Sequence, residues 1–310
     1  MFCMRKKRSG LAVALVFLAL VQVSVSVPFI VLHGIAASCS QGKEANFTQL
    51  LTNLSGSPGY CIEVGNGKRD SWFMPLMKQT EIVCEKVKQM KELRQGYHIV
   101  GRSQGNLVAR GLIEFCDGGP RVFNYISLAG PHAGISSVPL CGEINKYLGK
   151  SKYLPKLNNE IPNERNSTYK DRFTSLHNLV LVKFQDDKVI VPQDSSWFGF
   201  YPDGAFKPLL SAQQTKLYTE DWIGLKTLDD AGKVKFVSVK GAHIIMADLD
   251  VLQSKDITIR KSWNLILTAI AFQSRINHIG YNLQPTKLSP HPGDETVEVK
   301  ALWVENWNEG

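Results

Sequence analysis

The sequence of 310 residues lacks the short motifs that mark most metal and nucleotide sites. It has no C-x-x-C pair, no H-E-x-x-H helix, and no G-x-G-x-x-G or Walker sequence. It also has no internal repeats and no low-complexity tracts. Its hydrophobic content of 44% and charged content of 21% are ordinary for a globular protein with a sizeable core. The sequence therefore calls for neither a metal ion nor a nucleotide cofactor.

Acidic residues are missing from the first 26 positions, which changes how the net charge of +8 is interpreted. Four basic residues at 5–8 precede an apolar stretch at about 11–21, and Ser24 and Ser26 place small residues at a cleavage site. This pattern predicts a signal peptide over residues 1–26 rather than a retained anchor, because the apolar stretch is short for a spanning helix. The remaining 32 basic and 28 acidic residues give +4, too mild and dispersed to favour nucleic acid.

No later segment is long and apolar enough to span a membrane, so we expect no stable membrane span and entry into the secretory pathway. An odd number of cysteines follows the leader, which leaves at least one thiol without an intramolecular partner. These cysteines are Cys39, Cys61, Cys84, Cys116 and Cys141. Glycosylation sequons that agree with this compartment begin at Asn46, Asn53 and Asn166, and we expect them on exposed loops.

Short apolar runs alternate with amphipathic segments along the chain. The runs are typical of buried parallel strands, which we expect at 28–32, 60–64, 97–100, 122–128, 179–184 and 234–239. Helical periodicity is found at 82–93, 107–115 and 259–272. The alternation predicts an α/β protein with a mostly parallel sheet flanked by helices, in one domain over residues 27–280.

Two segments break this alternation. Residues 135–177 are polar and contain three prolines, which predicts a cap insertion above the sheet rather than another strand and helix. Residues 281–310 contain three prolines and two tryptophans, and we expect a peripheral C-terminal extension there.

The most informative motif is the pentapeptide Gly101-Arg102-Ser103-Gln104-Gly105, which lies between a predicted strand and a predicted helix. A serine nucleophile needs this context, because a tight strand-to-helix turn lifts its hydroxyl above the sheet and flanking glycines relieve crowding. The N-terminus of the following helix also directs backbone N–H groups at a developing oxyanion. We therefore predict that Ser103 is a nucleophile.

A serine nucleophile needs a histidine to take its proton and a carboxylate to orient that histidine. In this fold class the order along the chain is serine, acid, histidine. Asp186 and Asp187 follow the strand predicted at 179–184, and His243 follows the strand predicted at 234–239. Spacing does not choose between the two aspartates, and Asp194 is a further candidate later in the same loop.

Six other histidines compete with His243, but their positions fit less well. His98 lies inside a predicted strand and is expected to be structural. His33 and His132 end strands at the same edge of the sheet but precede the acid. The histidines in or after the predicted closing helix are expected at the surface.

An oxyanion needs two backbone donors. One should be the N–H of Gln104, directly after the nucleophile. The other should come from the loop after the first strand, where the sequence reads His33-Gly34-Ile35 and glycine lets the backbone approach the substrate. No cofactor is needed for this chemistry.

Several longer stretches resemble the palmitoyl-protein thioesterase family, α/β hydrolases of lysosomal type, and most closely its plant members. The stretches are Gly96-Tyr97 with the pentapeptide at 101–105, SLAGPHAG at 127–134 and VPQDSSWFGFY at 191–201. A further similar stretch is LYTED at 217–221, followed by GLK at 224–226. The resemblance spans about residues 28–272 and implies an α/β-hydrolase fold.

The resemblance implies that Ser103 is the nucleophile, Asp187 the acid and His243 the base, a choice that spacing left open. The implied reaction is hydrolysis of long-chain fatty acyl thioesters on the cysteines of S-acylated proteins or peptides, through an acyl-serine intermediate. The implied location is the lysosome, the vacuole or the extracellular space.

The resemblance also implies that Ile35 and Gln104 donate the two oxyanion N–H groups, and that Cys84 and Cys116 form a disulfide. Cys39 and Cys61 form another pair to consider.

The chain departs from the family after Cys141, where family members carry a longer helical cap with a second cysteine. The cap is predicted to be short here, and Cys141 has lost its partner. Two other functions therefore stay open: a broader lipase or carboxylesterase with the same residues, or a catalytically weak acyl-binding protein.

Overall fold

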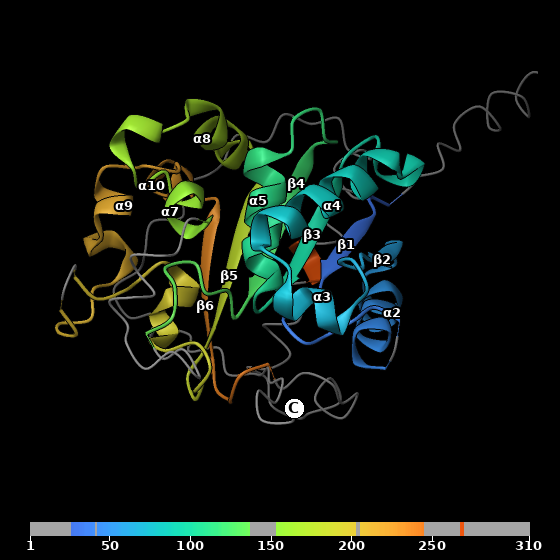
Figure 1. Cartoon of the computed structure of the whole chain (residues 1–310), viewed down its shortest axis with the longest axis horizontal. Helices are drawn as coiled ribbons and strands as arrows, with labels where there is room; N and C mark the ends of the chain where they lie inside the picture. Colours follow the sequence, from blue (N-terminus) through green and yellow to red (C-terminus); the bar gives the residue numbers. More distant parts are fainter. Residues whose placement is uncertain (1–25, 41, 137–152, 203–204, 245–266, 270–310) are drawn as a thin grey trace, which may run out of the picture.

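The computed structural model describes residues 26–40, 42–136, 153–202, 205–244 and 267–269. In this part of the chain, the strands form one sheet in the order β2-β1-β3-β4-β5-β6, and every neighbouring pair is parallel (Figure 1). The strands are β1 (Phe29–Leu32), β2 (Gly59–Cys61), β3 (Tyr97–Arg102), β4 (Val122–Leu128), β5 (Asn178–Phe184) and β6 (Val234–Val239). The predicted parallel sheet is confirmed.

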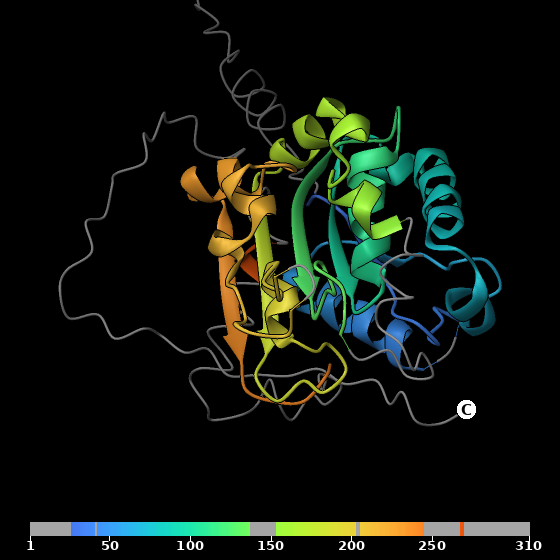
Figure 2. The same cartoon turned by 60° about the vertical axis from the view of Figure 1, so that its left-hand side comes forward.

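The helices cover both faces of this sheet (Figure 2). They are α2 (Lys43–Ser55), α3 (Lys68–Phe73), α4 (Leu76–Gln89), α5 (Gly105–Phe115), α7 (Tyr153–Leu157), α8 (Ser167–Thr174), α9 (Lys216–Thr219) and α10 (Leu225–Asp230). Single 3₁₀ turns are η1 (Lys91–Leu93), η2 (Pro162–Glu164), η3 (Gln193–Trp197) and η4 (Ala212–Gln214).

Side-chain alternation along the strands divides the core into two layers. Ile30 and Leu32 of β1 point into a cluster that also contains residues of α4, α5, α8 and α10. Phe29 and Val31 point to the opposite face, where they pack with residues of α2. Because successive side chains of a strand face opposite sides, a strand buried on both faces is apolar throughout. This explains why uninterrupted apolar runs predicted the strands.

Some predicted boundaries differ from the structure. The strand predicted at 60–64 ends at Cys61, and the following residues form a loop at the carboxyl edge of the sheet. Of the predicted closing helix only 267–269 are described, and they are helical. The predicted leader, apart from Ser26, the C-terminal extension and Cys141 lie outside the described residues.

Helix α8 differs from the expectation for residues 135–177. We predicted an insertion above the sheet, but Phe173 of α8 and the following Leu176 are fully buried in the same core layer as α5. Asn166 caps this helix, with its side-chain oxygen accepting the Thr168 N–H at 2.9 Å. The helix therefore belongs to the layer that covers the sheet and leads directly into β5. The low apolar content of α8 concealed this packing in the sequence, because only a few apolar side chains attach the helix to the core.

Two disulfides tie loops to this framework. Cys84–Cys116 joins α4 to the end of α5, and Cys39–Cys61 joins the loop after β1 to the end of β2. Closing loops of this length stabilises a folded chain by about 3 kcal/mol each. None of the described helices is both long and apolar enough to cross a lipid bilayer.

The strand order changes direction at one position along the sheet. The chain leaves β1 toward β2 on one side, and it returns to β3 on the other side of β1. In open parallel sheets, ligands bind at the carboxyl ends of the strands where the connections diverge in this way. The loops that follow β1 and β3 therefore meet at the expected binding edge.

Candidate active site

Ser103 stands in a strained turn at the carboxyl end of β3. Its φ angle is +49°, a left-handed conformation that a residue with a side chain seldom adopts. The flanking glycines leave no room for a side chain: a Cβ on Gly101 would lie 2.2 Å from Asn106 Oδ1, and one on Gly105 would lie 2.3 Å from the Leu32 carbonyl oxygen. The turn thus brings the start of α5 directly against the end of β1.

A buried asparagine holds this turn in place. Asn106 Nδ2 donates to the carbonyl oxygens of Ser103, at 3.1 Å, and Leu128, at 2.9 Å. The Tyr125 hydroxyl donates to Asn106 Oδ1 at 3.0 Å, and the Ser103 N–H donates to the Leu128 carbonyl at 2.9 Å. Asn106 is not among the residues predicted from the sequence. A signal was available, since a polar residue in the first turn of a helix that is buried almost throughout needs internal partners.

His243 lies between Ser103 and Asp187. Its Nε2 is 3.0 Å from Ser103 Oγ, and its Nδ1 is 2.7 Å from Asp187 Oδ2. The other carboxylate oxygen accepts the N–H groups of Val189, at 2.8 Å, and Ile190, at 2.9 Å. All three side chains are at most 4% exposed. Chemically, this chain of contacts would allow a hydroxyl to pass its proton to a ring that a carboxylate orients.

The competing aspartates lie elsewhere. Asp186 is exposed, whereas its neighbour Asp187 points inward. Asp194 forms an ion pair with Lys183, with Oδ1 2.9 Å from Nζ. Of the three candidate acids, only Asp187 has a hydrogen bond to His243.

The competing histidines that the structure describes have other partners. His98 is buried inside β3 and accepts the Asn124 N–H at 3.2 Å; burial, with His177 nearby, lowers its pKa to about 3. His132 is stacked on Phe198 with ring centroids 4.4 Å apart, and burial, followed by the charge of Arg110, lowers its pKa well below the ordinary value. Both rings are therefore neutral and contribute to the core.

The two expected oxyanion donors come from adjacent strands. Leu32 of β1 pairs with Gly101 of β3, so the loops carrying Ile35 and Gln104 leave the sheet side by side. Among the described residues, neither of these two N–H groups donates a hydrogen bond. Helix α5 begins at Gly105, and the positive end of its dipole faces the same place.

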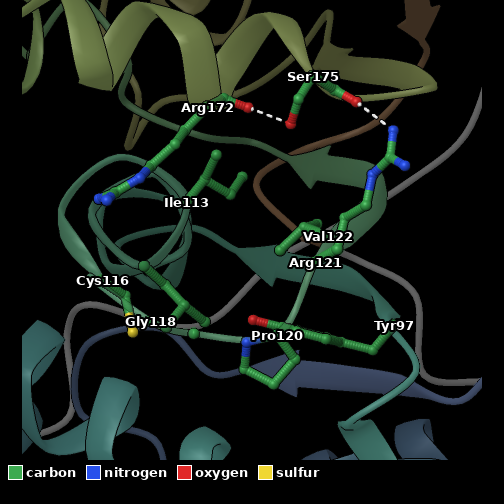
Figure 3. A pocket seen from close by; sticks show the side chains of 11 residues that line it. Tyr97, Ile113, Cys116, Gly118, Pro120, Arg121, Val122, Arg172 and Ser175 are labelled. Atoms are coloured by element: carbon green, nitrogen blue, oxygen red, sulfur yellow. Dashed lines mark hydrogen bonds between the residues drawn. The ribbon is translucent and has the colours of Figure 1, made fainter.

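A pocket of about 210 Å³ lies at the opposite edge of the sheet (Figure 3). Its walls include Tyr97 and Val122, the first residues of β3 and β4, together with the turn at Gly118 and Pro120. Ser103 follows the other end of β3. This pocket is therefore separate from the serine site.

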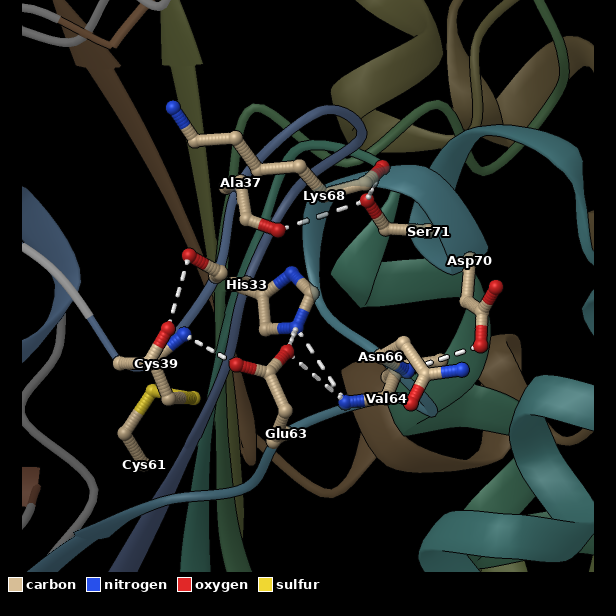
Figure 4. A network of polar contacts seen from close by, with 12 residues as sticks. His33, Ala37, Cys39, Cys61, Glu63, Val64, Asn66, Lys68, Asp70 and Ser71 are labelled. Atoms are coloured by element: carbon tan, nitrogen blue, oxygen red, sulfur yellow. Dashed lines mark hydrogen bonds and ion pairs between the residues drawn. A yellow bond between two sulfur atoms is a disulfide. The ribbon is translucent and has the colours of Figure 1, made fainter.

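Three potential metal ligands cluster at the loops after β1 and β2: His33, Cys39 and Glu63, with ligand atoms within 4.8 Å of one another (Figure 4). Cys39 is bonded to Cys61 in a disulfide, so it offers no thiolate. His33 and Glu63 already contact each other, with Nε2 2.8 Å from Oε1. The cluster is therefore a hydrogen-bonded network rather than a metal site.

Two of the three predicted glycosylation sites are not on loops as expected, while the third, Asn166, lies in the loop before α8. Asn46 and Asn53 are exposed residues of α2, and Asn166 is the partly buried residue that caps α8. Glycosylation of the three stays a prediction.

The parallel sheet, its flanking helices and the serine turn between β3 and α5 define the molecule as an α/β-hydrolase. A sequence model of the family described as "Palmitoyl protein thioesterase" matches residues 28–145 and 141–243. The chain belongs to this family, and it is a thioester hydrolase.

Relatives agree with this assignment. The chain is 30% identical to palmitoyl-protein thioesterase 3 of Dictyostelium discoideum, over 74% of this chain and 90% of the relative. It is 30% identical to palmitoyl-protein thioesterase 1 of Caenorhabditis elegans, over 70% and 86% of the two chains. It is 28% identical to lysosomal thioesterase PPT2-B of Xenopus laevis, over 72% and 88%. The predicted family is confirmed, while the closer likeness to plant members stays a prediction.

Proposed function

We propose that the chain removes long-chain fatty acyl groups from the cysteines of S-acylated proteins or peptides, with Ser103 as nucleophile, His243 as base and Asp187 as the orienting acid. The observation that supports these roles is the position of His243, 3.0 Å from Ser103 Oγ and 2.7 Å from Asp187 Oδ2. A histidine that contacts a serine hydroxyl through one nitrogen and a carboxylate through the other is held ready to accept the hydroxyl proton.

The reaction has two halves. His243 Nε2 takes the proton of Ser103 as its Oγ attacks the thioester carbon, and the oxyanion collapses with loss of the cysteine sulfur, which takes that proton from His243. A water molecule then gives a proton to His243 and attacks the acyl-serine, and Ser103 leaves with the proton as the free fatty acid forms. Asp187 stays ionised throughout and stabilises the His243 imidazolium.

The N–H groups of Ile35 and Gln104 are the proposed oxyanion donors. Thiolate leaves readily, so the enzyme mainly has to stabilise the oxyanion and bind the acyl chain. Neither N–H group donates a hydrogen bond among the described residues, and the two follow the carboxyl ends of the neighbouring strands β1 and β3. Donors that are fixed by the backbone before the reaction suit this purpose.

The proposed compartment is the lysosome or vacuole, or the extracellular space. Residues 1–26 are the proposed signal peptide, and disulfides such as Cys39–Cys61 and Cys84–Cys116 persist in oxidising compartments. Several relatives, including the one from Xenopus laevis, are named lysosomal thioesterases. Asn46, Asn53 and Asn166 are the proposed glycosylation sites.

The proposed cap is shorter than in the family. The two segments matched by the family meet at residues 141–145, the place where the sequence indicates a missing stretch. A shorter cap would leave less of the acyl chain covered. We therefore expect the chain-length preference to differ from that of relatives with a full cap.

Labelling with a fluorophosphonate probe, together with turnover of a palmitoyl thioester, tests the proposal. We expect the probe to modify Ser103, and Ser103→Ala to abolish labelling and lower thioester hydrolysis by at least about 10³-fold. Faster turnover of an oxygen ester of equal chain length would favour a broader esterase. Absence of labelling in folded protein would favour an acyl-binding protein.

A further inference from the structure

A second carboxylate–imidazole pair lies on the other side of Ser103, in the loops after β1 and β2 (Figure 4). His33 directly follows β1 and is 3% exposed. Its Nε2 is 2.8 Å from Glu63 Oε1, and its Nδ1 is 3.0 Å from the carbonyl oxygen of Gly34. This pair takes no part in the proton transfers proposed for Ser103 and His243.

The Gly34 carbonyl belongs to the same peptide group as the Ile35 N–H. A peptide group is planar and trans, so its C=O and N–H point in opposite directions and turn together. A hydrogen bond to the Gly34 oxygen therefore fixes the direction of the Ile35 N–H. It also polarises the peptide group, which makes that N–H a stronger donor.

Both ring nitrogens of His33 face oxygen acceptors. A neutral imidazole has only one N–H, so contacts with both the Gly34 carbonyl and the Glu63 carboxylate require the doubly protonated ring. The Val64 N–H donates to Glu63 Oε1 at 3.2 Å and passes His33 Nε2 at 3.4 Å, so its shorter contact is with the carboxylate. The geometry describes an imidazolium–carboxylate pair.

Glu63 also holds the far end of the same loop. Its second oxygen, Oε2, accepts the Cys39 N–H at 2.7 Å, and Cys39 is joined to Cys61 at the end of β2. The Glu63 carboxylate thus contacts this loop at two places, the side chain of His33 at its start and the N–H of Cys39 further along. The segment between them contains Gly34 and Ile35.

We propose that Glu63 and His33 are positioning residues of the oxyanion hole: Glu63 orients the His33 imidazolium, and His33 fixes the Gly34–Ile35 peptide so that the Ile35 N–H points at the developing oxyanion. The inference rests on the proposed role of Ile35 as an oxyanion donor. Neither side chain touches the reacting atoms. They act through the peptide group between them and the substrate.

Loss of the His33 proton breaks the arrangement. A neutral ring keeps only one N–H, so it loses its hydrogen bond either to Gly34 or to Glu63. Burial alone would lower the pKa of His33, but the hydrogen bonds to Glu63 and Gly34 and the charges of Glu63 and Glu44 outweigh it and raise the pKa. Glu44 of α2 is itself paired with Arg102. Activity is therefore expected to fall on the alkaline side as His33 loses its proton.

Steady-state kinetics of Glu63→Gln against a palmitoyl thioester over a range of pH test the inference. We expect kcat to fall about ten- to hundredfold, less than the ~10²–10³ for complete loss of an oxyanion donor. KM should stay within about twofold, because the oxyanion forms only in the transition state. The alkaline limb of the kcat profile should move to lower pH, since His33 loses the partner that raises its pKa.

The matched control is Asp70→Asn. Asp70 is another carboxylate on the same side of the sheet, and its Oδ2 accepts the Asn66 N–H at 2.8 Å (Figure 4). This substitution removes the same charge but leaves the contacts of His33 intact, so we expect wild-type kcat and an unchanged alkaline limb. A Glu63→Gln protein with wild-type kcat and pH profile would overturn the inference, as would equal losses in both variants.

Nitrogen-15 NMR of the histidine rings in the wild-type protein gives a second readout that needs no variant of Glu63 to fold. The His33 signals can be assigned by their loss in His33→Gln or, if that variant does not fold, through ring-to-backbone correlations. At about pH 6, below the ordinary histidine pKa, these signals should report two protonated nitrogens. A neutral ring at that pH would contradict the proposal. This readout is independent of catalysis, so an inert Ser103 would defeat the proposed function without altering the result for His33.

Discussion

Two carboxylate–imidazole pairs flank Ser103, and they differ in what the second ring nitrogen faces. In the Asp187–His243 pair, the free nitrogen of the ring lies 3.0 Å from a hydroxyl, the side chain of Ser103. In the Glu63–His33 pair, it lies 3.0 Å from a carbonyl oxygen, that of Gly34. A hydroxyl can give up a proton, whereas a carbonyl oxygen can only accept a hydrogen bond.

This difference assigns opposite tasks to the same two functional groups. His243 keeps a lone pair toward Ser103 and suits the role of base. His33 has acceptors at both nitrogens and suits the role of a fixed cationic donor. The proposed tasks of the two histidines therefore differ because of the partner of the second nitrogen and not because of the carboxylate.

The largest effect is expected when the Asp187–His243 pair is broken. Asp187→Asn should lower kcat by about 10³–10⁴-fold, because an amide can no longer hold His243 in the tautomer that accepts the Ser103 proton. Thioester hydrolysis by purified protein measures the loss. Asp186→Asn is the matched control, since Asp186 is exposed next to Asp187, and it should retain wild-type kcat. Equal losses in both variants would rule out Asp187 as the acid.

Removing each disulfide in turn distinguishes an effect on the position of the loop after β1 from an effect on overall stability. Replacing both cysteines of either pair with serine should lower the free energy of unfolding by about 3 kcal/mol, since the bridges close loops of 22 and 32 residues. Only the Cys39–Cys61 bridge holds the loop with Ile35, so only its removal should also lower kcat at a temperature where both variants are folded. Chemical denaturation and kinetics on the same samples measure the two effects. Equal kcat values for the two variants would count against a link between that loop and catalysis.

The sequence predicted the strands and the serine turn better than the contacts around them. Short, continuous apolar runs are typical of strands buried on both faces of a sheet. To interpret the pentapeptide at 101–105 as a serine turn, it is enough to predict a strand before it and a helix after it. The choice between Asp186 and Asp187 depends on which side chain turns inward, where Asp187 accepts the N–H groups of Val189 and Ile190. Spacing carries no such information, and the family resemblance was needed.

The partnership of His33 with Glu63 had no signal in the sequence. The two residues are 30 positions apart and belong to different loops, so only the parallel pairing of β1 with β2 brings them together. The strand predicted at 60–64 also placed Glu63 inside the sheet, whereas β2 ends at Cys61 and leaves Glu63 in a loop. An error of a few residues at a strand end was enough to hide its role.

Gly105 lies where the Ser103 turn meets the loop that begins at His33, and a side chain at this position should disturb both the turn and the loop. A Cβ on Gly105 would lie 2.3 Å from the Leu32 oxygen and 2.5 Å from the His33 oxygen, both rigid backbone atoms. Gly105→Ala should cost about 1–3 kcal/mol of stability and lower kcat by separating the His33 loop from the Ser103 turn. Melting temperature and kinetics provide the measurements.

Gly111→Ala in the same helix is the comparison for Gly105→Ala. Its Cβ would meet the Tyr153 hydroxyl at 2.2 Å and the Thr80 side chain at 2.8 Å, away from both histidine pairs. We expect lower stability but normal kcat per folded molecule. A normal kcat in Gly105→Ala as well would show that the close approach of α5 to β1 is only structural.

The smallest expected effect is the pH dependence of stability from the Glu63–His33 pair. The pKa of His33 is raised above 6.5 in the folded protein. Its contribution to the free energy of unfolding is therefore complete below pH 6.5 and is lost as the pH rises through the pKa of the folded state. Burial alone would raise the pKa of Glu63, but the hydrogen bond and charge of His33, with the Cys39 and Val64 N–H groups, lower it below 4.5. The share of Glu63 is therefore complete above pH 4.5 and is lost as the pH falls through its folded value.

The pair should thus stabilise the protein most between pH 4.5 and 6.5. Glu63→Gln should lower the free energy of unfolding by about 1 kcal/mol in this window, a modest value because Glu63 is partly exposed and screened by water. The difference between wild type and variant, measured by urea denaturation from about pH 4 to about pH 9, should shrink toward both ends. A difference that stays constant across the whole range would mean that the pair is not ionised, and the contrast with the Asp187–His243 pair would then lose its physical basis.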